Sequence, residues 1–146
     1  MLRTHRLYVQ PLFAMLLVSA TGVANAAEPA GKNWHGDWST ARRESQAQGR
    51  PILLFVTMDN CYYCTKMSHE TFGDSHVMQD IERDFLLARV SSERNPDLVR
   101  RLNVRLFPTT VILGPDETVI DSISGYVGPQ QFRSRLKSTG KRIARR

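Results

Sequence analysis

The apolar positions of this chain gather in short continuous runs that alternate with segments of helical spacing. Residues 52–57 (Ile-Leu-Leu-Phe-Val-Thr) are apolar and partly β-branched, which is typical of a central strand covered on both faces. Two further strands are predicted at residues 85–90 and 109–113. Residues 114–117 (Gly-Pro-Asp-Glu) form a turn sequence, so residues 118–122 are expected to pair with the preceding strand as an antiparallel hairpin.

Helices are predicted between these strands from their capping residues and from apolar positions three or four apart. The first runs from an N-cap at Asp37 or Ser39 to Gly49, ahead of the first strand. The other helices are expected from Cys61 to about residue 69, from residue 74 past residue 81, after Asn95-Pro96, and from Gly128-Pro129 through residue 136. This order predicts an α/β fold: a central mixed sheet with a C-terminal antiparallel hairpin, flanked by helices, with one extra N-terminal helix.

The first 26 residues have the composition of a cleaved secretory signal. Arg3 and Arg6 form a positive start, residues 12–18 are apolar, and Ala24-Asn25-Ala26 supplies a small-x-small cleavage site. An uncleaved membrane anchor is the alternative, but polar residues and a proline interrupt residues 7–27, whereas a span needs about 20 predominantly apolar residues. We therefore expect a periplasmic or secreted protein, cleaved near Ala26.

The rest of the chain is long enough for one domain with a real core and too short for two. We divide it into a flexible lead-in at residues 27–36, a domain at residues 37–138 and a basic C-terminal tail at residues 139–146. Cleavage removes two of the 20 basic residues and none of the 14 acidic ones, so the net charge falls from +6 to +4. A basic tail could bind nucleic acid or anionic lipid. A solvated helix face followed by a frayed chain end explains the charges more simply, so we expect no nucleic-acid partner.

Cys61 and Cys64 are the only cysteines, and they follow the first central strand as Cys61-Tyr62-Tyr63-Cys64. A strand that delivers a CxxC pair to the start of a helix is the arrangement of a dithiol/disulfide redox site. A secreted protein that used disulfides only for stability would usually carry several, so one close pair favours exchange chemistry. Cys61 is the predicted nucleophile, because the helix N-terminus stabilises its thiolate, and Cys64, one turn further in, is predicted to resolve the mixed disulfide.

A zinc site is the competing interpretation of the same segment. Cys61, Cys64, His69 and His76 have the spacing C-x2-C-x4-H-x6-H. This is not the spacing of a common zinc finger, and an oxidised cysteine pair offers no thiolate ligands. We therefore predict no metal and no cofactor besides the redox-active pair itself.

In these features the chain resembles the thioredoxin superfamily, over nearly its whole length after the signal. Residues 104–109 (Val-Arg-Leu-Phe-Pro-Thr) are similar to the segment that carries the superfamily's cis-proline. Residues 49–54, 64–67 and 70–74 are similar to exported thioredoxin-like domains related to the C-terminal domain of thiol:disulfide interchange proteins.

The resemblance implies a thioredoxin-like fold and a site built around the cysteine pair. Phe107 and a cis Pro108 would bind substrate through free backbone groups, and Tyr62 and Tyr63 would contact the substrate beside the sulfurs. Two further residues are expected to support the site: Lys66 and Thr109. A solvated charge is the alternative for Lys66, and filling the core is the alternative for Phe107.

The sequence departs from the superfamily pattern behind the cysteines. Phe55 occupies the position of a buried aspartate, and Arg89 matches a nearby lysine. Arg89 cannot relay protons, because a guanidinium stays protonated. The residues between the cysteines, Tyr62 and Tyr63, also replace a Gly-Pro pair, so the redox potential does not carry over.

We therefore predict an exported thiol:disulfide oxidoreductase that exchanges disulfides with protein substrates. The first hypothesis is a monomeric reductase supplied with electrons by a membrane partner. A disulfide oxidase or isomerase is the alternative within this class. A non-catalytic thioredoxin-like module that binds peptides and keeps a structural disulfide is the alternative from another class.

Overall fold

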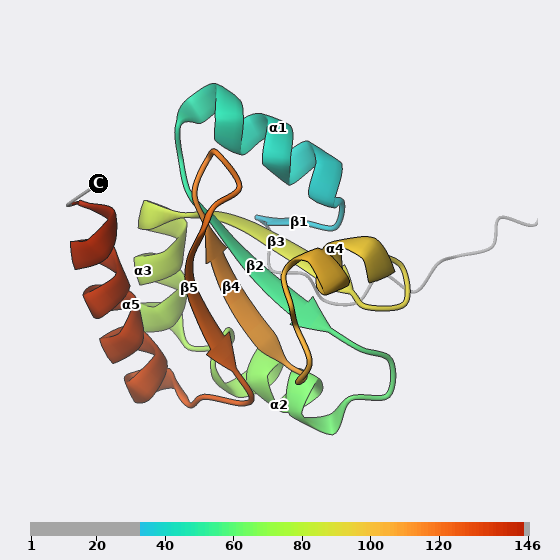
Figure 1. Cartoon of the computed structure of the whole chain (residues 1–146). Helices are drawn as coiled ribbons and strands as arrows, with labels where there is room; N and C mark the ends of the chain where they lie inside the picture. Colours follow the sequence, from blue (N-terminus) through green and yellow to red (C-terminus); the bar gives the residue numbers. More distant parts are fainter. Residues whose placement is uncertain (1–32, 145–146) are drawn as a thin grey trace, which may run out of the picture.

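A five-stranded mixed sheet forms the centre of the computed structural model, which describes residues 33–144 (Figure 1). The strand order is β1-β3-β2-β4-β5; β3 pairs in parallel with β1 and β2, whereas β4 pairs antiparallel with β2 and β5. The strands are β1 (Trp34–His35), β2 (Ile52–Thr57), β3 (Leu86–Ser91), β4 (Thr109–Leu113) and β5 (Val119–Ser124). This architecture confirms the predicted α/β fold with its antiparallel hairpin.

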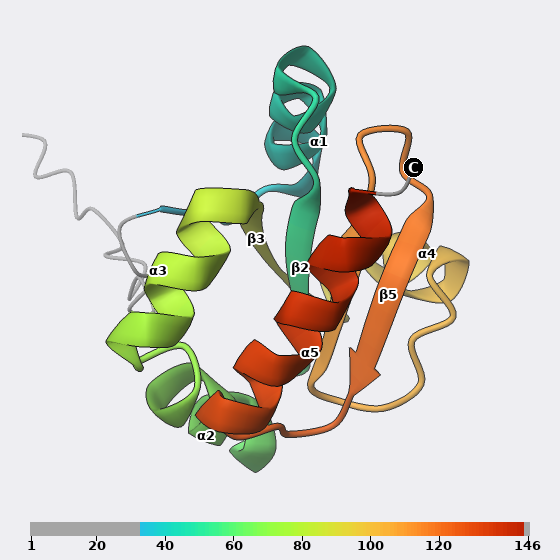
Figure 2. The same cartoon turned by 90° about the vertical axis from the view of Figure 1, so that its left-hand side faces the viewer.

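Helices cover both faces of the sheet, and Figure 2 shows α3 and α5 side by side in front of it. The helices are α1 (Trp38–Gln48), α2 (Tyr62–Glu70), α3 (Ser75–Asp84), α4 (Pro96–Arg101) and α5 (Pro129–Ile143). Asp37 caps α1 by accepting the N–H groups of Ser39 and Thr40, and α1 ends at Gly49 in the left-handed conformation with φ 65°. Asp37, not Ser39, is therefore the N-cap.

The alternation of side chains along β2 divides the core into two layers. Leu53 and Phe55 point to the face covered by α2, α3 and α5, and Ile52, Leu54 and Val56 point to the face covered by α1 and α4. All six residues of β2 are buried, as expected for the central strand of a sheet covered on both faces. The cysteine pair is thus attached to a strand that is buried along its whole length.

The start of the ordered domain lies earlier than the expected boundary at residue 37. Trp34 and His35 form the edge strand β1, and the Trp34 ring packs edge-on against Phe55 and Phe72, with centroids 6.2 and 5.1 Å apart. Burial of a large aromatic ring holds this segment on the sheet, so residues 34–35 are not part of a flexible lead-in.

The last helix continues beyond the expected domain end at residue 138. Thr139 is fully buried, and its hydroxyl donates to the Asp121 carboxylate at 2.5 Å. Arg135 and Arg142 bind the same carboxylate, so the helix is fixed to β5 as far as its last turn. The segment expected to be a basic tail is therefore largely a packed helix.

The predicted β3 and β5 differ from the observed strands by one or two residues at their ends. The predicted signal peptide at residues 1–26 and the first part of the predicted lead-in lie outside the described residues. Between residues 33 and 144 the structure has no helix whose length and hydropathy suit a membrane span.

Candidate active site

Cys61 and Cys64 form a disulfide at the point where β2 leads into α2. The S–S distance is 2.06 Å and the Cα atoms are 5.2 Å apart. Cys61 is the N-cap residue of α2, and its sulfur accepts the backbone N–H of Cys64 at 3.1 Å. Cys61 is half-buried, whereas Cys64 is only 2% exposed. The outer sulfur therefore has the helix N-terminus and an amide donor directed at it, which stabilise a thiolate there.

The Phe107–Pro108 peptide bond is cis, as the resemblance implied. Val56 pairs with Thr109, so Pro108 lies at the end of the sheet where β2 leads towards Cys61. The Thr109 hydroxyl donates to the carbonyl of Leu106 at 2.6 Å, and the Pro108 carbonyl accepts the N–H of Gly125 at 2.8 Å. These two bonds fix the proline loop on both sides.

Tyr62 and Tyr63 expose large aromatic surfaces on the first turn of α2, with 71% and 55% of each residue accessible. Their rings meet edge to face at 5.3 Å. Leu106, on the proline loop, is also exposed, whereas Phe107 is half-buried and packs against both core layers. Phe107 thus fills the core with its ring, while the tyrosines and Leu106 are available to a partner.

Tyr126 is a site residue that the sequence reasoning missed. Its ring lies 6.4 Å from that of Tyr63, its hydroxyl donates to Glu70 at 2.5 Å, and the ammonium of Lys66 lies 4.9 Å from the ring centroid. The pKa of Tyr126 is raised, chiefly by its hydrogen bond to Glu70. Lys66 therefore makes a cation–π contact with this aromatic ring.

Behind the disulfide, Phe55 and Arg89 are register partners on neighbouring strands. The Arg89 guanidinium lies 5.7 Å from the centroid of the Phe55 ring. At the two positions where the superfamily pattern has a buried aspartate and a nearby lysine, this chain thus has a cation–π contact between Phe55 and Arg89.

An open hollow of about 910 Å³ adjoins the cysteines on the side of the loop at residues 58–60. Both sulfur-bearing residues line it, together with charged side chains of Asp59, Arg89 and Arg94. The Glu93 carboxylate accepts the N–H of Asp59 at 3.1 Å, and this bond is the largest cause that lowers the pKa of Glu93. Glu93 thereby fixes the loop that precedes Cys61.

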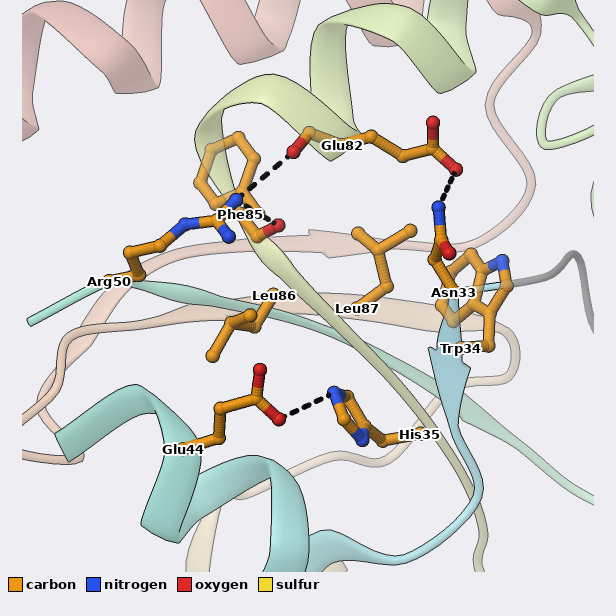
Figure 3. A pocket seen from close by; sticks show the side chains of 9 residues that line it. All are labelled: Asn33, Trp34, His35, Glu44, Arg50, Glu82, Phe85, Leu86 and Leu87. Atoms are coloured by element: carbon orange, nitrogen blue, oxygen red, sulfur yellow. Dashed lines mark hydrogen bonds and ion pairs between the residues drawn. The ribbon is translucent and has the colours of Figure 1, made fainter. Parts of the chain in front are cut away.

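A second hollow, of about 420 Å³, lies where β1 meets the start of β3, at the opposite end of β2 from the cysteines (Figure 3). Its polar side chains bind one another or the backbone: Glu44 pairs with His35, the amide of Asn33 donates to Glu82, and Arg50 donates to two carbonyls at the end of α3. It contains no sulfur, and we assign it no chemistry. Within residues 33–144, no group of three or more possible ligands could hold a metal ion.

A sequence profile of the thioredoxin-like domain family matches residues 38–140. The chain belongs to this family. It is 27% identical over 100 residues to the thiol:disulfide interchange protein DsbD of Yersinia pestis, a match that covers 65% of this chain and 17% of that protein. The chain thus matches only about a sixth of the length of these curated relatives.

Solved structures agree with the family assignment. A thioredoxin from Thermus thermophilus is 26% identical with a TM-score of 0.66, over 73% of this chain and 85% of that one. The oxidised C-terminal domain of DsbD from Neisseria meningitidis is 15% identical with a TM-score of 0.61, over 73% of this chain and 98% of that domain. The second likeness shows the fold alone. The thioredoxin-like domain predicted from the sequence is therefore confirmed.

Proposed function

We propose that this thioredoxin-like domain is an exported thiol:disulfide oxidoreductase that reduces disulfides of other proteins. The observation that carries the proposal is the asymmetry of the pair: Cys61 is partly accessible and accepts a backbone N–H, while Cys64 is buried behind it. One sulfur suited to attack and a second suited to resolve the product are the two components of disulfide exchange.

In the proposed reaction, the Cys61 thiolate attacks a substrate disulfide. A bond forms between Cys61 and one substrate sulfur, and the other substrate sulfur leaves as a thiolate. Cys64 then attacks Cys61, closes the Cys61–Cys64 disulfide and releases the second substrate thiolate. The two electrons gained by the substrate come from the domain's dithiol, which a separate donor must restore.

The surface beside the disulfide supports a protein substrate. Tyr62 and Tyr63 are exposed next to Cys61, Leu106 is exposed on the proline loop, and the backbone of Phe107 precedes the cis proline at the end of the sheet. An extended substrate segment would pair with Phe107 as an added strand and cover the tyrosines with its side chains.

The direction of exchange and the location are part of the proposal. The similarity to DsbD supports a periplasmic reductase fed by a membrane electron donor, and the composition of residues 1–26 supports export. An oxidase or isomerase would use the same two sulfurs in the other direction, so the potential of the pair against glutathione distinguishes them.

Trapping tests the assignment of the two sulfurs. The Cys64→Ala variant should accumulate substrates as mixed disulfides on Cys61, because the resolving sulfur is absent, and Cys61→Ala should accumulate none. Equal capture by both variants in non-reducing electrophoresis would contradict the assigned roles. A wild-type pair that resists dithiothreitol in the folded protein would instead identify a binding module with a structural disulfide.

A further inference from the structure

Thr110 carries a buried hydroxyl that has no hydrogen-bond partner within the described part of the chain. It lies in β4, two residues after the cis proline, and none of its surface is accessible. Native proteins seldom leave a buried polar atom unpaired, and such an atom calls for an explanation in function or in another state of the protein. The structure shows the site only with its disulfide closed.

The register places this hydroxyl on the same face of the sheet as Cys64. Thr110 pairs with Phe55 on one side and with Ile123 on the other, and paired residues point to the same face. Phe55, Ile123 and Cys64 all belong to the buried layer under α2. Thr110 therefore directs its hydroxyl into the layer that receives the inner sulfur.

The inner sulfur needs a donor that the rest of this layer does not offer. Cys64 has to become a thiolate to resolve a mixed disulfide, and burial in apolar surroundings opposes that charge. Among the described residues, the hydrophobic cluster that contains Cys64 has no polar side chain besides Thr110 directed at it from β4. The buried hydroxyls of Thr71 and Thr139 already donate elsewhere, to the Val127 carbonyl and to Asp121. The charged residues that line the hollow beside the disulfide are Asp59, Arg89 and Arg94.

We propose that the Thr110 hydroxyl donates a hydrogen bond to the Cys64 thiolate and is a further catalytic residue of the exchange reaction. This inference rests on the proposed function. In the closed disulfide the Cys64 sulfur is neutral and bonded to Cys61, so the hydroxyl is left without a partner. When the bond opens, the two sulfurs separate to beyond their contact distance, and the inner one becomes an acceptor for Thr110.

In the resolving step the Cys64 thiol first loses its proton to water. The resulting thiolate attacks Cys61, the Cys61–Cys64 bond forms, and the bond between Cys61 and the substrate breaks with its electron pair on the substrate sulfur. Thr110 keeps its own proton throughout. It stabilises the charged sulfur before attack and loses its partner again when the disulfide closes.

The test compares Thr110→Val, which keeps the shape and removes the hydroxyl, with Thr110→Ser, which keeps the hydroxyl. In a Cys61→Ala background the ultraviolet absorbance of the thiolate, followed as the pH rises, reports the pKa of Cys64 alone. Thr110→Val should raise that pKa by about one unit, a tenfold loss of thiolate, whereas Thr110→Ser should leave it nearly unchanged. An equal pKa in the valine variant and its parent would overturn the proposal.

A second measurement separates catalysis from folding. With both cysteines present and oxidised, Thr110→Val should not lower the free energy of unfolding, because it removes a hydroxyl that has no partner. A clear loss of stability in the oxidised valine variant would show that the hydroxyl serves the fold instead. If the valine variant does not fold, Thr110→Ala provides the same pKa comparison.

The trapping experiment keeps this inference distinct from the proposed function. If Cys64→Ala captures no substrate, the proposed exchange reaction itself is contradicted. If Cys64→Ala captures substrate but the Cys64 pKa is unchanged in Thr110→Val, only the proposed role of Thr110 is contradicted.

Discussion

The Tyr126 hydroxyl donates a hydrogen bond of 2.5 Å to the Glu70 carboxylate, across 56 residues of sequence. This bond joins the loop before α5 to the last turn of α2. A second bond runs parallel to it, from the Thr71 hydroxyl to the carbonyl of Val127 at 2.6 Å. Because Gly125 in the same loop donates to the carbonyl of Pro108, the loop connects the helix that carries the cysteines with the cis proline at the same end of the sheet.

Removing the hydrogen bond between Tyr126 and Glu70 should weaken substrate binding more than it slows the chemical step. Tyr126→Phe keeps the ring beside Tyr63 but frees it from Glu70, so the aromatic surface becomes less ordered and KM for a protein disulfide should rise about threefold, with kcat nearly unchanged. Tyr126→Ala removes the ring as well and should raise KM about tenfold. Steady-state kinetics of protein disulfide reduction would measure both.

A small disulfide provides the control for Tyr126, because it does not reach the aromatic surface. Its reduction should proceed at nearly the wild-type rate in both variants. Equal losses on the small and the protein substrate would mean that Tyr126 acts on the cysteines rather than on binding.

Glu93 should matter for the rate of exchange through the loop that it holds. Glu93→Ala removes the acceptor of the Asp59 N–H, so the approach to Cys61 becomes less ordered, and kcat/KM should fall about threefold. Glu93→Gln keeps a carbonyl acceptor and should retain most of the activity. If the glutamine variant is as slow as the alanine variant, the negative charge is what matters, and the hydrogen bond to Asp59 is not the cause.

Much of the fold follows from local patterns that the sequence displays. The apolar run at residues 52–57, the turn at residues 114–117 and the caps at Asp37 and Gly49 each predict an element that the structure contains. The position of the cysteine pair at the start of a helix follows in the same way. The prediction of a cis bond at Pro108 rests on the family resemblance, because X-Pro bonds are mostly trans and composition alone disfavours the cis form.

The features that sequence patterns missed are contacts between distant segments. Tyr126 stands between Gly125 and a valine, in a stretch that looks like an ordinary loop, and nothing local points to Glu70. Trp34 packs into the core against Phe72, a residue far from it in the sequence. Tertiary packing decides such contacts, so periodicity and capping rules do not reveal them.

The buried carboxylate of Asp121 should be a major determinant of how α5 is held. Its side chain is 3% exposed and accepts from Arg135, Thr139 and Arg142. Asp121→Asn removes the charge and leaves these donors poorly matched. The free energy of unfolding in urea should fall by about 2 kcal/mol, less than for a fully buried pair because both arginines remain half-exposed and can be hydrated.

The matched control is Asp97→Asn, which breaks the ion pair with Arg100 on the surface of α4. Both partners there are mostly exposed, so the variant should change the free energy of unfolding by less than about 0.5 kcal/mol. Similar losses in the two variants would show that burial of Asp121 adds nothing to its interactions with α5.

The same carboxylate should make stability depend on pH in acid. Burial raises the pKa of Asp121, but hydrogen bonds from Arg135, Thr139 and Arg142 outweigh it and hold the pKa well below the ordinary value of 3.8. The unfolded chain therefore binds a proton at a higher pH than the folded one. The contribution of Asp121 is fully present above about pH 4 and is lost as the pH falls towards the folded pKa.

Unfolding in urea at several values between about pH 5 and pH 2 would measure this contribution. Other carboxylates also titrate in this range, and the pKa of Asp80 is lowered chiefly by its hydrogen bond from Arg133. The informative quantity is therefore the difference between the wild type and Asp121→Asn, since the asparagine cannot be protonated there. That difference should shrink as the pH falls below about 4, because the unfolded wild type takes up a proton at Asp121 that the folded wild type does not, and the variant has no such group. A difference that stays constant down to pH 2 would mean that the Asp121 pKa is the same in the folded and unfolded chains.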